Sequence, residues 1–235
     1  MPQADGQGLK DTALRIFQGL AREYDRTVDY ATLFQDRRWK QWAGRQIPAR
    51  PGNMVLDVGC GTLLMEERML GSGCLFVGID LTEEMIRGGQ SKKVPNVGLL
   101  VNGDAESLPF HDATFDSVVS CYVPKYVAVW NFAREVARIT KPGGVAVLYD
   151  FAKPRGPLAP LLEAYIQAGL RVVGFLLGLA RRREAFTFNE LPEIVEQTTW
   201  DSEVSSAMEQ AGFETLATER LTRGVVFGYS GRMRK

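Results

Sequence analysis

A chain of 235 residues is long enough to bury a large hydrophobic core, and an α/β sheet of this size commonly forms one domain. Lysine and arginine total 28 and aspartate and glutamate total 28, so no net charge attracts nucleic acid, and we expect no nucleic-acid partner. The cysteines, Cys60, Cys74 and Cys121, lack CxxC spacing, which argues against a zinc site or a disulfide framework. We therefore expect a cytoplasmic protein without a bound metal or a signal peptide.

The N-terminal 50 residues are expected to form a helical cap. Residues 9–43 have a helical pattern of mixed polarity that includes Tyr24, Asp25, Trp39 and Trp42, and this segment could cover the mouth of a site. After the cap we expect a ligand-binding core at 51–151, a helical lid or substrate insert at 152–200, and a C-terminal helix and hairpin at 201–235. All four parts belong to one predicted domain.

Five apolar runs of strand length predict a parallel sheet in the core. They lie at 54–59, 75–80, 97–104, 115–122 and 144–151, and helix-length amphipathic segments separate them. Most of these runs are apolar on both faces, as buried parallel strands are. A helix is predicted over 82–93, where Thr82 could cap the N-terminus and Glu83 and Glu84 suit the helix dipole. The fold class is therefore a Rossmann-like α/β fold.

The C-terminal stretch has a different pattern. It predicts a helix at about 201–210 and then two strands, FETLATERL at 213–221 and GVVFGYSG at 224–231. Two such strands separated by a short turn predict an antiparallel hairpin at one edge of the sheet. We therefore expect a mostly parallel sheet of seven strands.

A glycine-containing loop follows the first predicted strand. In DVGCGT, Gly59 and Gly61 lack a Cβ, so the backbone can turn sharply and approach a ligand closely. Asp80 ends the second strand, where a carboxylate can accept both ribose hydroxyls of an adenosine. The alternative is that the glycines only form a tight turn and the acids only cap helices. The joint placement favours a nucleoside site.

The residues around this loop indicate which nucleoside binds. A dinucleotide site usually reads GxGxxG, but this chain reads GCGTLL, with Leu64 in place of the third glycine. Asp57 would repel a phosphate, yet it suits the ammonium and sulfonium charges of S-adenosylmethionine. Asp104, after the third strand, could accept a hydrogen bond from an adenine amino group. The pattern therefore predicts a cationic adenosine compound.

Longer motifs carry a family resemblance. DVGCGT, GIDLTEEM, NGDAESLPFHDATFD and TKPGG resemble the ordered landmarks of the class I S-adenosylmethionine methyltransferases. LYDFAKP at 148–154 and LTRGVV at 221–226 resemble stretches of a narrower group, the quinone-ring C-methyltransferases of menaquinone and ubiquinone synthesis. FNELPEI at 188–194 and AGFE at 211–214 are similar to further motifs of that group, so the resemblance spans nearly the whole chain.

The resemblance implies a set of cofactor-binding residues. It makes Asp57, Gly59 and Gly61 the loop at the methionine end, Asp80 the ribose acid, and Asp104 with Ala105 the adenine contact. Ser120 would lie beside the cofactor, and Tyr24 resembles an N-terminal tyrosine that covers it. Three further residues of the matched motifs are expected to contact the cofactor: Cys60, Leu81 and Met85.

Two departures from the group concern the loop and the acceptor. The family commonly has glycine where this chain has Leu63, which is expected to narrow the loop. Quinone methyltransferases usually read FGxRN after strand four, and this chain reads YVPKY, with Lys125 and Tyr126 replacing the Arg and Asn. The second departure leaves the methyl acceptor open.

A prenylated hydroquinone is the acceptor that the resemblance implies. Its ring carbon becomes nucleophilic as a hydroxyl loses a proton, so a cation or base near the phenolate would help. Lys125 could stabilise the phenolate, Tyr122 or Tyr126 could orient the ring or relay a proton, and Asp150 is a possible base. A solvated loop lysine and packed tyrosines are the alternatives. His111, in a loop, is not expected to be catalytic.

The apolar segment 157–183 is broken by Glu163, Gln167 and Arg171, which argues against a membrane span. It suits a lid over a lipid-like acceptor or shallow contact with anionic lipid, and an ordinary core helix is equally consistent with it. Other functions also stay open: methylation of a phospholipid amine or a small phenol, a nucleotide-binding module without chemistry, or a lipid carrier. The sequence leaves the oligomeric state open.

Overall fold

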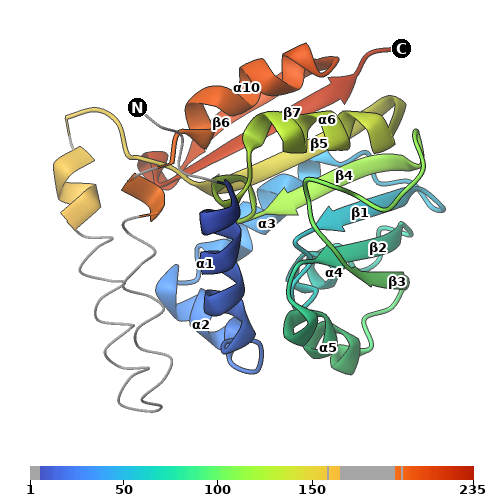
Figure 1. Cartoon of the computed structure of the whole chain (residues 1–235), viewed down its shortest axis with the longest axis horizontal. Helices are drawn as coiled ribbons and strands as arrows, with labels where there is room; N and C mark the ends of the chain where they lie inside the picture. The colour runs from blue at the N-terminus through green and yellow to red at the C-terminus, as the bar shows by residue number, and fades with distance from the viewer. Residues whose placement is uncertain (1–5, 158, 165–193, 197) are drawn as a thin grey trace.

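A seven-stranded sheet organises the computed structural model, which describes residues 6–157, 159–164, 194–196 and 198–235. The strand order is β3-β2-β1-β4-β5-β7-β6 (Figure 1). The first five strands run parallel, whereas β7 is antiparallel to both β5 and β6. The predicted fold and the edge hairpin are confirmed. The strands are β1 (Met54–Val58), β2 (Leu75–Asp80), β3 (Val97–Asn102), β4 (Phe115–Cys121), β5 (Thr140–Phe151), β6 (Phe213–Leu221) and β7 (Val226–Met233).

Helices cover both faces of the sheet because successive side chains of each buried strand point to opposite faces. Leu56 and Val58 of β1 pack in one core with α6 (Val129–Ile139) and α10 (Trp200–Gln210). Val55, which precedes Leu56, packs in a second core with α3 (Asp36–Gln46) and α4 (Leu64–Arg68). The strands are therefore apolar on both faces, as the continuous apolar runs predict.

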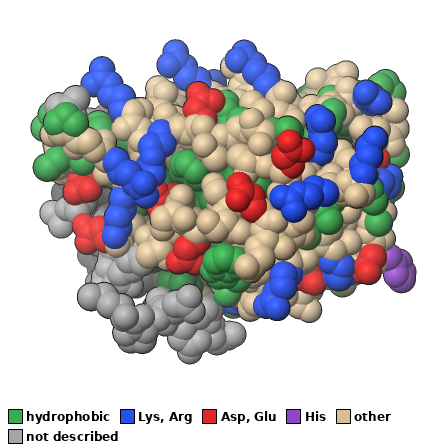
Figure 2. Space-filling view, turned by 90° about the horizontal axis from the view of Figure 1, so that it is seen from above, with side chains coloured by type: hydrophobic (Ala, Val, Ile, Leu, Met, Phe, Trp, Pro, Cys, Tyr) green, Lys and Arg blue, Asp and Glu red, His purple; other side chains and the backbone are tan. Residues whose placement is uncertain are grey.

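The predicted N-terminal helical region consists of three helices, α1 (Gly6–Gln18), α2 (Tyr24–Ala31) and α3. Figure 1 shows α1 and α2 beside the ends of the parallel strands toward which the arrows point. On the molecular face over α6 and α10, basic and acidic side chains lie side by side (Figure 2). This distribution agrees with the balanced totals of charged residues.

Several boundaries differ from the predicted ones. Strand β5 begins four residues earlier than predicted, and the turn η2 (Thr222–Gly224) takes Gly224 out of the last strand. Helix α5 (Glu83–Lys92) begins where predicted, with Thr82 at the N-cap position, but the Thr82 side chain makes no cap hydrogen bond. The N–H and the side chain of Thr82 bond to Asp80 instead, so the predicted cap is wrong.

The predicted lid segment 157–183 lies outside the described residues apart from 157 and 159–164. Within the described parts of the chain, no helix is long and apolar enough to cross a membrane.

Candidate functional site

A cavity lies at the carboxyl ends of β1, β2, β3 and β4, where the strand order reverses between β1 and β4. In open α/β sheets, this reversal point is where ligands bind. The wall of the cavity is completed by α1, α2 and the turn that follows β4. Among the predicted cofactor residues, those lining the cavity are Tyr24, Gly59, Gly61, Asp80, Leu81, Met85, Asp104 and Ala105.

The loop after β1 forms the floor of this cavity, and its two glycines have positive φ angles. Gly59 has φ +77°, and a Cβ added to it would lie 2.1 Å from Cγ2 of Val123. Gly61 has φ +53°, and a Cβ there would lie 3.1 Å from Cε of Met85. A side chain at either position would strain the backbone and fill space in the loop. The loop therefore leaves bare backbone facing the cavity.

Asp80 connects this loop to the end of β2. Its Oδ2 accepts the Gly61 N–H at 2.9 Å, and its Oδ1 accepts the Thr82 N–H at 2.8 Å. Burial raises the pKa of Asp80, while these backbone hydrogen bonds oppose the rise. A carboxylate has about four acceptor sites, and the Thr82 side chain takes a third one, so at least one remains for a hydroxyl of a ligand.

A lysine that the sequence analysis missed holds α1 against Asp104. The Lys10 Nζ lies 2.8 Å from Oδ2 of Asp104 and 2.8 Å from Oε1 of Glu106, and Lys10 also lines the cavity. Asp104 Oδ1 accepts the Glu106 N–H at 2.9 Å. No sequence signal marks this pair, because 94 positions separate Lys10 from Asp104.

Aromatic side chains form another part of the cavity wall. The Phe17 ring meets Tyr24 edge-on with ring centroids 6.0 Å apart, and it meets Tyr126 at 5.9 Å. Burial raises the pKa of the Tyr24 phenol well above its usual value, so this group keeps its proton at neutral pH. Helices α1 and α2 thus give the cavity an apolar cover.

Three predicted cofactor residues, among them Cys60 of the loop itself, are buried and do not line the cavity. Ser120 is fully buried, and its hydroxyl donates to the Val58 carbonyl at 2.8 Å. Cys60 is buried, and desolvation raises the pKa of its thiol well above the usual value. Asp57 is buried as well, and desolvation is the main reason that its pKa is raised to about 7. Asp57 and Ser120 support the loop from behind.

Asp57 has a buried neighbour, Glu66 of α4, that the sequence analysis also missed. Oδ1 of Asp57 and both carboxylate oxygens of Glu66 have no hydrogen-bond partner among the described residues. Desolvation and the charge of Asp57 raise the pKa of Glu66 well above its usual value. Glu66 is close enough to hydrogen-bond Asp57, and that bond forms only when one of the two carboxyls holds a proton, because a carboxylate has no donor. Lys40 and Lys92 are the cations that favour ionisation of Glu66.

Leu63, which stands where the family commonly has glycine, does not narrow the cavity. Leu63 has φ +67°, which is unusual for a residue with a side chain, and it is not among the cavity-lining residues. Its buried side chain packs toward α5, where a Cβ on Gly89 would lie 2.8 Å from Cγ of Leu63. The glycine at 89 therefore makes room for the leucine at 63.

The four predicted acceptor-side residues divide into two pairs. Tyr122 and Tyr126 line the cavity. Lys125 and Asp150 do not line it; they form an ion pair of 2.7 Å, and both side chains are at most 1% exposed. Desolvation lowers the pKa of Lys125 and raises that of Asp150. Lys125 is therefore not the solvated loop lysine that the sequence left open.

The ion pair fixes the turn after β4. Lys125 Nζ donates to the Tyr122 carbonyl at 2.9 Å and lies 4.2 Å from the centroid of the Tyr126 ring. Asp150 accepts the backbone N–H groups of Lys125 at 3.1 Å and Phe151 at 2.7 Å. On the other side, the Tyr122 hydroxyl donates to Oδ1 of Asp36 at 2.7 Å. The two tyrosine rings are thus held in place from behind.

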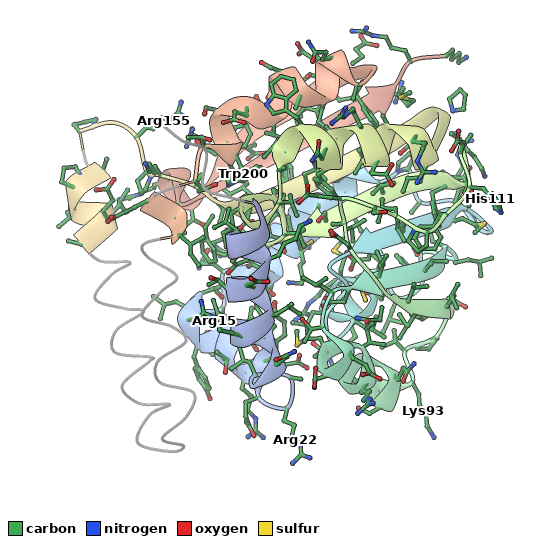
Figure 3. The ribbon with its side chains drawn as sticks, in the orientation of Figure 1. Arg15, Arg22, Lys93, His111, Arg155 and Trp200 are labelled. Carbon is green, nitrogen blue, oxygen red and sulfur yellow. The ribbon has the colours of Figure 1, made fainter. Side chains whose placement is uncertain are left out.

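His111 is remote from this arrangement. Figure 3 shows it at the far end of the molecule from α1, which carries Arg15. Its side chain is exposed, and it follows the loop after β3 at the end opposite the cavity.

Comparisons with known proteins agree with this geometry. Residues 7–232 match the ubiE/COQ5 methyltransferase family. A demethylmenaquinone methyltransferase of Mycolicibacterium vanbaalenii is 30% identical over 213 residues, which is 90% of each chain. One of Mycobacterium tuberculosis is 31% identical over 218 residues, covering 92% of this chain and 90% of the relative.

Solved structures share the fold. A putative methyltransferase of Haloferax volcanii, solved in complex with its Trm112 activator, has a TM-score of 0.67 at 19% identity, covering 93% of this chain and 98% of that one. Phosphoethanolamine N-methyltransferase 2 of Haemonchus contortus, solved with S-adenosylmethionine, has a TM-score of 0.65 at 12% identity, covering 93% and 60%. The family match and the bare glycine loop beside Asp80 lead to one conclusion: the chain belongs to the ubiE/COQ5 methyltransferase family and is an S-adenosylmethionine-dependent methyltransferase.

Proposed function

We propose that this methyltransferase C-methylates the ring of an isoprenoid hydroquinone such as demethylmenaquinol. The observation that carries the proposal is the shared cavity: the aromatic wall of Phe17, Tyr122 and Tyr126 faces the same space as the loop at Gly59 and Gly61. A planar acceptor ring on that wall would lie next to a methyl donor on the loop. The names of the relatives from M. vanbaalenii and M. tuberculosis support a demethylmenaquinone substrate.

The cofactor roles are part of the proposal. When bound, S-adenosylmethionine supplies its methyl group as an electrophile. Asp80 receives the ribose hydroxyls, Asp104 and Ala105 contact the adenine, and the loop at Gly59 and Gly61 receives the methionine end. Residues with supporting roles around this site are Tyr24 as cover, Leu81 and Met85 as walls, and the buried Asp57, Cys60 and Ser120.

On the acceptor side, the chain mainly aligns the ring and excludes water, because methyl transfer is an in-line displacement that depends on alignment. Tyr122 and Tyr126 orient the hydroquinone. Lys125 and Asp150 act through them as positioning residues, since both are buried behind the turn. The positive charge of Lys125, close to the Tyr126 ring, acts on the acceptor only in part, because Asp150 at 2.7 Å offsets most of it.

Localisation follows from the acceptor. A quinol with an isoprenoid tail is amphiphilic, so we propose a cytoplasmic enzyme that contacts the membrane surface peripherally. A phospholipid amine or a small phenol is the competing acceptor. It is included in the test because this chain has Lys125 and Tyr126 where the quinone methyltransferases usually have Arg and Asn.

The acceptor is tested by a competition. The purified protein receives cofactor with a labelled methyl group together with reduced demethylmenaquinone and phosphatidylethanolamine. Label in the quinol is the expected result, whereas labelled phospholipid beside unlabelled quinol would refute the proposal.

The cofactor role of Asp80 is tested by titration. Asp80→Ala should weaken S-adenosylmethionine binding by about 1 to 3 kcal/mol, the loss expected for a charged hydrogen-bond partner, which is about 5-fold to 150-fold in Kd. Asp80→Asn keeps an acceptor for the loop and separates loss of charge from loss of loop structure. Asp112→Ala, at an exposed carboxylate that pairs with Arg138, is the control and should bind as the parent does. Unchanged affinity in Asp80→Ala would contradict the assignment.

A further inference from the structure

Three large apolar side chains at the corner between α2 and α3 are exposed within five residues of each other. Tyr30 is 61% exposed, Leu33 57% and Phe34 49%. The rings of Tyr30 and Phe34 contact each other edge-on, with centroids 5.8 Å apart. The other large apolar side chains that are exposed in the described parts of the chain are spread over several elements. We call Tyr30, Leu33 and Phe34 the apolar corner.

The backbone of the apolar corner holds these side chains outward in an unusual conformation. Leu33 and Phe34 are consecutive residues with positive φ, +49° and +61°. The Phe34 N–H donates to the Asp29 carbonyl at 2.7 Å, and the Leu33 N–H donates to the Tyr30 carbonyl at 3.1 Å. Glycine or asparagine suits such a turn better than leucine or phenylalanine, and polar residues suit its exposure better. Neither the turn conformation nor solubility in water therefore accounts for leucine and phenylalanine at positions 33 and 34.

Arginines surround the apolar corner. Arg26 lies one helical turn before Tyr30 on α2, the guanidinium of Arg37 lies 5.4 Å from the centroid of the Phe34 ring, and Arg38 follows it. All three arginines are exposed. Within residues 26–38, all of which the structure describes, no acidic side chain is exposed: Asp29 pairs with Arg37, and Asp36 is buried with Lys40. Asp29 offsets the charge of Arg37, so the excess positive charge of this stretch comes from Arg26 and Arg38, although the whole chain is neutral.

We infer that the apolar corner and its arginines bind the surface of a bilayer that contains anionic phospholipid. Leucine and phenylalanine enter the headgroup region, tyrosine suits the interface, and arginine pairs with phosphate in a bidentate manner. A protein partner would need no basic ring around the apolar tip, whereas an anionic lipid surface does.

Helix α2 forms part of the cavity wall, and α3 supports that wall from behind. Helix α2 begins at Tyr24, which lines the cavity, and α3 carries Asp36, which accepts the hydrogen bond from Tyr122. Docking through the apolar corner would hold the cavity next to the bilayer. The purpose of this docking rests on the proposed function, because an isoprenoid quinol resides in the bilayer.

Cosedimentation with vesicles tests the surface without any turnover. The parent should bind phosphatidylglycerol–phosphatidylcholine vesicles and bind pure phosphatidylcholine vesicles weakly. Leu33→Asn combined with Phe34→Asn removes the apolar side chains but suits the positive φ angles, so its melting temperature should not fall. This variant should lower the partition coefficient about tenfold or more. Leu99→Asn, at an exposed leucine of the edge strand β3, is the matched control and should bind as the parent does.

The charge requirement is tested separately. Arg26→Gln combined with Arg38→Gln should reduce binding to the anionic vesicles about tenfold or more and remove their advantage over phosphatidylcholine. The inference is overturned if the parent binds no vesicles, if the asparagine variant binds as the parent does, or if that variant changes only the oligomeric state, which would make the corner a contact between copies.

Turnover separates this inference from the proposed function. The asparagine variant should methylate demethylmenaquinol in anionic vesicles more slowly than the parent and methylate a short-tailed soluble analogue at the same rate. Equal slowing on both quinols would overturn the surface assignment. A parent that binds vesicles but methylates neither quinol would overturn the acceptor and leave the surface standing.

Discussion

The buried ion pair behind the acceptor wall allows a quantitative test of its role. Lys125→Met and Asp150→Asn each remove one charge and preserve most of the side-chain volume. Each leaves the other charge inside the protein, because the Lys125 and Asp150 side chains are at most 1% exposed. The combined variant leaves no buried charge at this position.

The structure sets the expected magnitudes. Breaking a buried pair on one side costs about 3 to 5 kcal/mol, and the lower end applies here because two backbone N–H groups still donate to Asp150 when Lys125 is absent. The Tyr122 carbonyl likewise remains for Lys125 when Asp150 is changed. We therefore expect each single variant to lose about 3 kcal/mol and the double variant to lose about 1 to 2 kcal/mol.

The dependence on pH identifies the buried carboxyl. Burial raises the pKa of Asp150, and Lys125 opposes the rise, so Lys125→Met should raise that pKa further. The folded state then binds a proton that the unfolded chain, with a carboxyl pKa near 3.9, releases as pH rises above about 4. The destabilisation in Lys125→Met should accordingly be smaller at pH 5 than at pH 8.

Urea unfolding of the parent, both single variants and the double variant measures these free energies. Single losses that add up in the double variant would show that Lys125 and Asp150 do not interact, which would refute the reasoning. Turnover measured below the unfolding range adds the functional reading. If Lys125 only positions the tyrosines, the double variant should have a kcat closer to that of the parent than either single variant has. If the charge of Lys125 acts on the acceptor, the kcat of the double variant should stay as low as that of Lys125→Met.

Two further predictions concern the loop beneath the cofactor. Because desolvation raises the pKa of Asp57 to about 7 and also raises that of Glu66, stability should fall as pH rises from about 4 through 7. Glu66→Gln supplies a permanent hydrogen-bond donor, so in melts between pH 5 and 8 the loss of stability should be shallower by up to about 1.4 kcal/mol per pH unit. The control Glu67→Gln should lose stability with pH as the parent does. If Glu66→Gln and the parent lose stability with the same slope, the two carboxyls do not share a proton. Gly89→Ala should destabilise the protein by about 1 to 3 kcal/mol, because its Cβ would lie 2.8 Å from Leu63. In a double-mutant cycle, Gly89→Ala should cost less stability when position 63 is alanine than when it is leucine. An equal cost with either residue at position 63 would contradict the contact.

The sequence contained most of the information on the sheet and the loop because both depend on local patterns. Val55 and Leu56 point to opposite faces and are both fully buried, which a continuous apolar run indicates without any tertiary knowledge. Gly59 and Gly61 need positive φ angles, and glycine in a short motif indicates this directly. Such signals come from neighbours in the chain, so a single sequence is sufficient to interpret them.

The pairings across the site could not be predicted, because they depend on residues that only the folded chain brings together. Lys10 shows no sign in its own helix that it will meet Asp104. Glu66 looks like an ordinary first-turn acid of a short helix, yet it is buried beside Asp57. In each case a distant charge or burial outweighed the local preference.

The two sides of the cavity therefore differ in how firmly they are fixed. The cofactor side consists of backbone turns at strand ends, where a glycine or an aspartate has few substitutes. The acceptor side consists of side chains on α1, α2 and the turn after β4, held by contacts such as Phe17 with Tyr126 and Tyr122 with Asp36. Such contacts can be replaced without disturbing the sheet. A change of acceptor within this family would consequently appear first at positions such as 122 to 126, where this chain departs from the quinone methyltransferase pattern while its glycine loop keeps it.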